Sequence, residues 1–198
     1  MGYLVRLIIW VIVTIITLGL GGIWVAYDSI RWPIENASLA DRKVTFRASF
    51  LDFVVRLIIW FVITLVTFGV GAIWVAYDLI KWSVERIEVD DQRFTFEASF
   101  ADFLIKLVVW CVVTILTFGF GAIWVAYDAL KWTIEGSRYH ERARFTSTFT
   151  DYIGRVVIWI VVTLITLGIG GIWVGYDYYR WIAEKIEVPR RAAVPATA

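Results

Sequence analysis

The sequence predicts a mainly α-helical membrane protein of four tandem repeats. Each repeat is a helix–glycine turn–helix hairpin, and short β-hairpins link the repeats. Three observations predict this: one sequence block recurs four times, 60% of the residues are hydrophobic with a mean hydropathy of +0.74, and two glycines interrupt a charge-free apolar run in each copy. This composition exceeds the usual apolar share of a soluble domain, so a membrane environment is expected.

A Trp-Val-Ala-Tyr-Asp motif marks the four copies, with Gly in place of Ala in the last one. It begins at Trp24, Trp74, Trp124 and Trp173, with spacings of 50, 50 and 49 residues. A repeat of this period is typical of one supersecondary unit that is copied and packed against itself. We place the repeats at residues 1–48, 49–98, 99–147 and 148–189, followed by a disordered tail at 190–198.

Charge and rare residues exclude several functions. The net charge is +1, which does not indicate nucleic-acid binding. One cysteine and one histidine exclude a disulfide framework and a repeated metal or haem site within one chain. Without a nucleophile–base pair we expect no enzyme and no cofactor. We interpret His140 as a solvated turn residue, and Cys111 as a buried apolar filler because Phe61 and Val11 hold its place in other copies.

The second repeat illustrates the predicted elements. Ser49 stands three residues before Asp52, a capping-box spacing that predicts a helix from Phe50 to about Thr67. Two glycines then give the chain freedom to turn, and a second helix is expected from about residue 72 to 86. The same start occurs at Ser99 and at Thr148 with Asp151, and the predicted turn glycines are Gly19, Gly21, Gly69, Gly71, Gly119, Gly121, Gly168 and Gly170.

A β-hairpin is expected after the second helix. Residues 87–89 and 93–97 alternate in polarity on either side of a polar turn, which is the period of a strand. Residues 42–46 and 144–146 have a similar pattern.

Charged residues at helical spacing predict the register of each hairpin. Folding the helices back about the glycine turn places Arg56 opposite Glu85 and Trp60 opposite Lys81. We therefore expect an ion pair and a cation–π contact between the two helices. The equivalent predicted ion pairs are Arg6 with Glu35, Lys106 with Glu135, and Arg155 with Glu184.

Two membrane topologies are compatible with the apolar runs. Residues 57–77 are charge-free and could cross the membrane as one kinked span of roughly 31 Å. Alternatively, each hairpin enters and leaves on one side and reaches a depth of about 18 Å. Alternating spans would leave both sides with similar numbers of cations and no positive-inside bias, which favours re-entrant hairpins with their polar parts in the cytoplasm.

Several residues resemble the repeat of the YjgN-like bacterial inner-membrane proteins. They are Ile16-Thr17-Leu18-Gly19, then Ile23-Trp24 and Tyr27, and then Val44-Thr45-Phe46. The resemblance extends over all four copies. The family usually has Pro just before the Trp, where this chain has Gly-Ile or Ala-Ile. The resemblance implies a bacterial inner-membrane location and no chemistry.

The predicted function is that of a non-enzymatic membrane scaffold. Its hairpins would wedge into one leaflet, contact lipid, curve the membrane and assemble into a homo-oligomer through exposed strand edges. We interpret the tryptophans as interface anchors.

The alternative is a pseudo-fourfold ion channel. Thr-x-Gly-x-Gly begins at Thr17, Thr67, Thr117 and Thr166, and is similar to a potassium-channel filter. The deepest charges are Asp28, Asp78, Asp128 and Asp177, either as structural ion-pair partners or as acids lining a pore.

Overall fold

The computed structural model describes residues 2–36, 38–39, 42–90, 92–139 and 141–187, and confirms a mainly helical chain with small antiparallel strand pairs. His140 and the tail at 190–198 lie outside the described residues. Eight α-helices occur in the described part of the chain. They are α1 (Gly2–Ile16), α2 (Gly22–Asn36), α3 (Phe50–Val66), α4 (Ala72–Glu85), α5 (Phe100–Leu116), α6 (Ala122–Glu135), α7 (Phe149–Ile165) and α8 (Gly171–Lys185).

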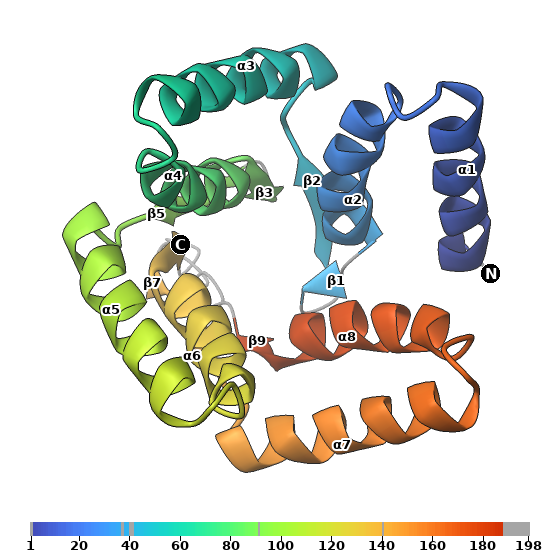
Figure 1. The fold of residues 1–198 in the computed structure, drawn as a ribbon, viewed down its shortest axis with the longest axis vertical. Helices are drawn as coiled ribbons and strands as arrows, with labels where there is room; N and C mark the ends of the chain where they lie inside the picture. The colour runs from blue at the N-terminus through green and yellow to red at the C-terminus, as the bar shows by residue number, and fades with distance from the viewer. Residues whose placement is uncertain (1, 37, 40–41, 91, 140, 188–198) are drawn as a thin grey trace, which may run out of the picture.

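Consecutive helices form four hairpins that follow one another around a ring (Figure 1). Helices α1, α3, α5 and α7 form the outside of the ring, and α2, α4, α6 and α8 lie inside them. The four glycine turns lie at separate places on the circumference. The hairpins are therefore not arranged side by side with their turns together.

Capping boxes begin three of the outer helices, as the sequence predicts. The Ser49 hydroxyl accepts a hydrogen bond from the backbone N–H of Asp52 at 3.0 Å, and the Asp52 carboxylate accepts one from the Ser49 N–H at 3.1 Å. These bonds satisfy backbone donors that a helix start leaves without partners. Ser99 with Asp102 and Thr148 with Asp151 make the same box.

The two glycines of each turn have different roles. Gly69 has a φ of +91°, a backbone conformation that favours glycine. Gly71 is helical, but a Cβ there would lie 2.5 Å from the Thr67 hydroxyl oxygen. That hydroxyl donates to the Ile63 carbonyl at 2.7 Å and accepts from the Gly71 N–H at 2.7 Å. Gly71 therefore lets the threonine join the end of one helix to the start of the next.

Short strands close the base of three hairpins. Strands β2 (Arg42–Phe46) and β3 (Ile87–Val89) pair antiparallel, so the strand before α3 pairs with the strand after α4. The other closing pairs are β5 (Thr95–Phe96) with β6 (Ser137–Tyr139), and β8 (Arg144–Phe145) with β9 (Ile186–Glu187). The remaining strands are β1 (Ser38–Leu39), β4 (Gln92–Arg93) and β7 (Glu141–Arg142).

The predicted β-hairpin at residues 87–97 is correct only in its first half. Strand β4 pairs with β3 through Glu88↔Arg93, as a hairpin requires. The chain then leaves this partner, and β5 pairs with β6 of the next repeat unit. The second strand divides because its aromatic end packs against the next hairpin, where Phe96 lies on Trp132 of α6 with 5.4 Å between the ring centroids.

Aromatic cores lie where one hairpin meets the next. Tyr27 of α2 packs on Phe53 of α3, with ring centroids 5.8 Å apart, and its hydroxyl donates to the Ala48 carbonyl. Phe53 also contacts Trp60 and Trp82. Equivalent cores form around Phe103 and Tyr152. These three joints are therefore held by ring packing and by a hydrogen bond to the linker between the hairpins.

Within the described residues, no helix has both the length and the apolar character to cross a membrane. The longest helices, α3, α5 and α7, have 17 residues each.

Candidate functional site

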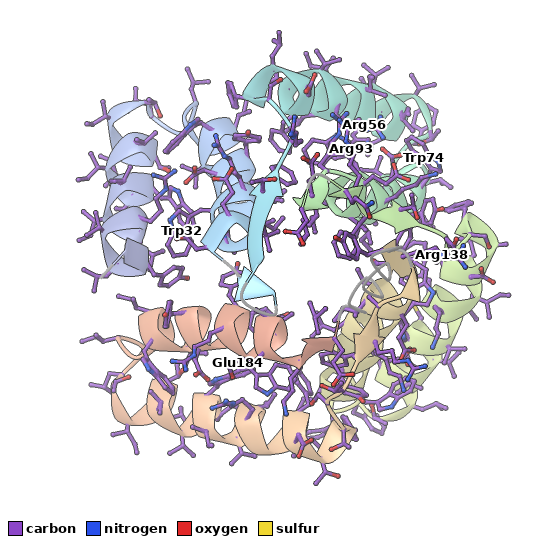
Figure 2. All side chains as sticks on the ribbon, turned by 180° about the vertical axis from the view of Figure 1, so that it is seen from behind. Trp32, Arg56, Trp74, Arg93, Arg138 and Glu184 are labelled. Atoms are coloured by element: carbon purple, nitrogen blue, oxygen red, sulfur yellow. The ribbon has the colours of Figure 1, made fainter. Side chains whose placement is uncertain are left out.

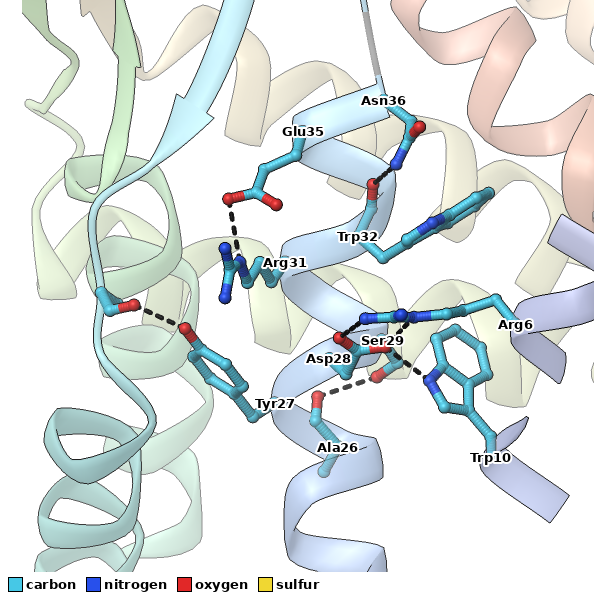
Figure 3. Close-up of polar contacts among 11 residues, drawn as sticks. Arg6, Trp10, Ala26, Tyr27, Asp28, Ser29, Arg31, Trp32, Glu35 and Asn36 are labelled. Atoms are coloured by element: carbon cyan, nitrogen blue, oxygen red, sulfur yellow. Dashed lines mark hydrogen bonds and ion pairs between the residues drawn. The ribbon is translucent and has the colours of Figure 1, made fainter. Parts of the chain in front are cut away.

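An aspartate joins the two helices of each hairpin, and it is buried in the first two hairpins and partly buried in the other two. In the first hairpin, Asp28 accepts a hydrogen bond from the Arg6 Nε at 2.6 Å and one from the indole N–H of Trp10 at 2.6 Å (Figure 3). The Arg6 Nη2 completes a bidentate ion pair with the same carboxylate. Asp28 is only 3% exposed, so water cannot solvate its carboxylate. Arg6 and Trp10 of the same hairpin supply the charge-assisted hydrogen bonds that replace this solvation.

The same cluster recurs in the other three hairpins. Asp78 pairs with the Arg56 Nε at 2.9 Å and accepts from the Trp60 indole at 2.8 Å. The corresponding groups are Lys106 and Trp110 on Asp128 at 2.7 and 2.8 Å, and Arg155 and Trp159 on Asp177 at 3.5 and 2.8 Å. We call these four groups the Asp clusters.

The predicted interhelical ion pairs are wrong in register. Arg56 pairs with Asp78 and not with Glu85, and the equivalent corrections are Arg6 to Asp28 instead of Glu35, Lys106 to Asp128 instead of Glu135, and Arg155 to Asp177 instead of Glu184. The true partner lies seven residues nearer the glycine turn. A long basic side chain can extend along the helix and reach the aspartate carboxylate. An unpaired charge shielded from water is more costly than one on a solvated surface glutamate, so the ion pair with the aspartate is favoured.

The glutamates of the predicted pairs bind within their own helices. Glu35 accepts a hydrogen bond from the Arg31 Nε at 2.8 Å (Figure 3). Glu184 accepts one from the Arg180 Nε at 2.8 Å. Glu85 and Glu135 lie 3.9 Å from Lys81 and Lys131. These are exposed i,i+4 pairs. The basic residues that follow the aspartates in the inner helices, Arg31, Lys81, Lys131 and Arg180, therefore pair with the glutamates and not with the aspartates.

Three tryptophans of the outer helices are buried and lack the exposure that an interface anchor needs. Trp60 is 8% exposed, and its indole N–H donates to Asp78 instead of facing Lys81 in a cation–π contact. Trp110 and Trp159 have the same burial and the same bond. A bulky indole at this position fills the interhelical space and supplies a donor to the carboxylate.

The four Thr-x-Gly-x-Gly turns do not converge on a common axis. They lie apart on the circumference of the ring (Figure 1). Each threonine hydroxyl bonds to the backbone of its own turn, as Thr17 does with Val13 at 2.7 Å and Gly21 at 2.6 Å. A filter needs these groups to face one ion path, so the turns act as helix connectors in this arrangement.

An exposed apolar surface follows the outside of the ring, and we call it the rim. It comprises the outward faces of α1, α3, α5 and α7 together with the turn tips, and Figure 2 shows side chains projecting outward from these helices all around the ring. Leu18, Phe68, Phe118 and Leu167, at the tips, are 93–98% exposed. Cys111 belongs to this surface, so its prediction as a buried filler is wrong.

The tip residues adopt an unusual backbone conformation. Leu18, Phe68, Phe118 and Leu167 all have φ of 51–52°, the left-handed region that costs a side-chain-bearing residue energy. Glycine or asparagine normally takes this place after a helix. A large apolar residue is retained there in all four turns, and the sequence pattern gave no indication of this feature.

Comparison with known proteins identifies one family. The model of a family described as "Bacterial protein of unknown function (DUF898)" matches residues 1–197. The YjgN-like proteins are part of that family, which is consistent with the resemblance found in the repeats. No curated protein and no solved structure matches this chain.

Proposed function

Since the chain belongs to this bacterial family of unknown function, we propose its role from its geometry: a non-enzymatic membrane scaffold that assembles into larger oligomers and curves the bilayer. The observation that carries this proposal is the rim. Soluble monomers rarely expose a large contiguous apolar surface. Here apolar side chains continue from α1 through α7, and a hydrocarbon environment removes the cost of exposing them to water.

The ring arrangement supports an orientation parallel to the membrane. The four tips point outward in different directions, so only a ring lying in the plane of the bilayer places all of them at one depth. We propose that the rim lies in the acyl region of one leaflet and that the strands lie at the polar boundary. A body that fills one leaflet expands that leaflet, which generates curvature.

The Asp clusters fit a structural role within this scaffold. In each cluster a basic side chain of the outer helix neutralises the charge of an aspartate on the inner helix, as Arg56 does for Asp78. A charge without partners in an apolar environment is costly, so each cation and each carboxylate needs the other. The clusters thereby fix the two helices of each hairpin in register.

Assembly into oligomers is proposed to use the short strands. Strand β4 ends one sheet and β9 ends another within the described residues. An unpaired strand edge offers backbone donors and acceptors to another chain.

The sole cysteine provides a direct test of membrane contact. Cys111 lies on the rim, so an environment-sensitive fluorophore attached to it should report an apolar site in vesicles and should be quenched by nitroxide groups placed on the acyl chains. The matched control is Thr95→Cys in a Cys111→Ser background, which places the fluorophore on an exposed position of β5. Equal quenching at the two positions would contradict the proposed orientation.

Electron microscopy of the reconstituted protein tests the scaffold function. We expect tubules or highly curved vesicles carrying assemblies of many copies. Vesicles that keep their shape and carry only single rings would contradict both the curvature and the assembly.

A further inference from the structure

One joint of the ring differs from the other three. Tyr27, Tyr77 and Tyr127 are 4–9% exposed, and their hydroxyls donate to the backbone carbonyls of the following linker. Tyr176, the equivalent residue of α8, packs on Tyr3 of α1 but remains 46% exposed. We call the joint of α8 with α1 and α2 the seam.

Two cavities lie at the seam, with volumes of about 300 and 370 Å³. Pro33, Tyr179 and Ala183 line both of them, so the cavities adjoin. The first contains polar groups at its walls, including Asn36, Arg180 and Glu184, and Trp32 and Glu184 lie on the two facing helices (Figure 2). The walls of the second are mainly aliphatic, including Ile30, Ile34, Ile182 and Ile186. Each volume is within the range of small-molecule sites.

A missing aromatic contact explains part of this space. In the other three repeats a strand phenylalanine packs on the tryptophan of the inner helix, as Phe46 does on Trp82 with 5.7 Å between their centroids. Trp132 and Trp181 have the same contact with Phe96 and Phe145. Trp32, their equivalent, packs on Tyr3 and lines the polar cavity.

The face of α8 at the seam also departs from the repeat. Gly175, Tyr179 and Ala183 are spaced by four residues and therefore lie on one face of the helix. Ala183 stands where the other copies have Ile34, Val84 and Ile134, and Val84 and Ile134 are buried core residues. Tyr179 replaces Ile30, Ile80 and Leu130, and Gly175 replaces Ala26, Ala76 and Ala126. The changes remove aliphatic volume at 183 and add a hydroxyl at 179.

The facing helix supplies a further polar group. Pro33 lies inside α2 and has no backbone N–H, so it cannot donate to the carbonyl of Ser29 four residues earlier. Ser29 lines the aliphatic cavity. The site thus combines aliphatic walls with polar residues, among them Ser29, Tyr179 and Arg180, whose guanidinium also donates to Glu184 at 2.8 Å.

From this combination we propose that the seam is a binding site for one acyl-chain lipid, whose chain occupies the aliphatic cavity and whose polar head lies beside Asn36 and Arg180. The adjoining cavities of opposite character match the two parts of an amphiphile. The site depends on the seam residues and is separate from the general contact of the rim with the bilayer.

Photo-crosslinking of the full chain tests this site. The protein is reconstituted in vesicles that contain a photoactivatable fatty acid, and mass spectrometry maps the labelled peptides. The rim should be labelled diffusely along α1, α3, α5 and α7 through its contact with the bilayer, and the seam should add labelling of α2 and α8. Ala183→Ile restores the residue type of the other repeats and should reduce this labelling by roughly tenfold, because the added methyl groups fill the cavity. The matched control is Ala101→Ile at an exposed position of α5, which should leave it unchanged.

A second variant covers the possibility that Ala183→Ile impairs folding. Ala183→Cys in the Cys111→Ser background can be alkylated after the protein has folded. Alkylation should abolish labelling of the seam, and bound lipid should slow the alkylation. Labelling confined to the rim, or labelling of α2 and α8 that neither block at residue 183 reduces, would overturn the proposal. A cross-link between two chains at the seam would also overturn it, because a second copy would then occupy the site.

Discussion

The ring of Tyr3 lies 6.1 Å from the ring of Tyr176, which joins the last repeat to the first. The same relationship holds at each other joint, with 5.8 Å for Tyr27 and Phe53, 5.9 Å for Tyr77 and Phe103, and 5.7 Å for Tyr127 and Tyr152. Four hairpins in sequence therefore close into a ring through one repeated aromatic contact.

Removing the Tyr3 ring should loosen the seam without unfolding the ring. We expect Tyr3→Ala to increase deuterium uptake in α8 and leave uptake in α5 unchanged, because Tyr3 contacts Tyr176 and Tyr179. Hydrogen–deuterium exchange in detergent measures this. Phe103→Ala is the matched comparison and should cost about 3 kcal/mol of global stability, since its ring is almost fully buried. Uniformly raised exchange in Tyr3→Ala would contradict a local role.

The register of the hairpins is tested by two acidic residues of α4. Asp78→Ala should lower the free energy of unfolding by about 3 kcal/mol, because it leaves the Arg56 cation without its buried partner. Glu85→Ala should change it by less than about 0.5 kcal/mol, since Glu85 forms an exposed pair with Lys81. Denaturation in mild detergent, followed by tryptophan fluorescence, gives both values. Similar losses for the two variants would contradict the Arg56–Asp78 register, and a larger loss for Glu85→Ala would support the Arg56–Glu85 register instead.

The exposed tip residues should have opposite effects on stability and membrane contact. Phe68→Gly relieves a left-handed conformation and should stabilise the detergent-solubilised protein by about 1 kcal/mol. The same change at Leu18, Phe118 and Leu167 as well should weaken membrane attachment, measured as the fraction that stays in the membrane pellet after an alkaline wash.

The control for the tips is Phe61→Ala on the outer face of α3, which removes apolar surface without relieving backbone strain. Phe61→Ala should weaken membrane attachment, and the stability of the detergent-solubilised protein should stay the same or fall. If the protein with all four tip residues replaced by glycine stays in the membrane pellet to the same extent as the unsubstituted protein, the tips have no role in membrane contact.

The capping boxes should make stability depend on pH in the acid range. Hydrogen bonds from the backbone and side chain of Ser49 lower the pKa of Asp52 below its usual value, and those from the side chain and backbone of Ser99 lower the pKa of Asp102. Bonds from the Thr148 side chain and backbone lower the pKa of Asp151. A lowered folded-state pKa gives stability that is present above the unfolded pKa of about 3.9 and is lost as pH falls through the folded value.

A triple variant isolates this contribution. Asp52→Asn, Asp102→Asn and Asp151→Asn together should lower the melting temperature at pH 7 and flatten its fall below pH 4. Melting temperature across pH 2 to 7, measured for both proteins in the same detergent, provides the comparison. Parallel curves would show that the boxes contribute no pH dependence.

The sequence by itself determined the local elements of this protein. The spacing of Ser49 and Asp52 predicted where α3 begins, and Gly69 and Gly71 predicted where the chain turns, because capping and positive φ depend on neighbouring residues only. The recurring block predicted four similar hairpins, and the resemblance found in it agrees with the family match.

Only the tertiary structure decided which residues meet. Arg56 pairs with Asp78 because a buried carboxylate without a cationic partner costs more free energy than an exposed one. Sequence spacing carries no information on burial. The divided strand at Phe94 and the seam at Tyr3 likewise depend on residues far apart in the chain. Hydrophobic periodicity predicts which helix face is apolar, but an apolar face can meet a core, a neighbouring hairpin or lipid, and the packing of the whole ring selects among them.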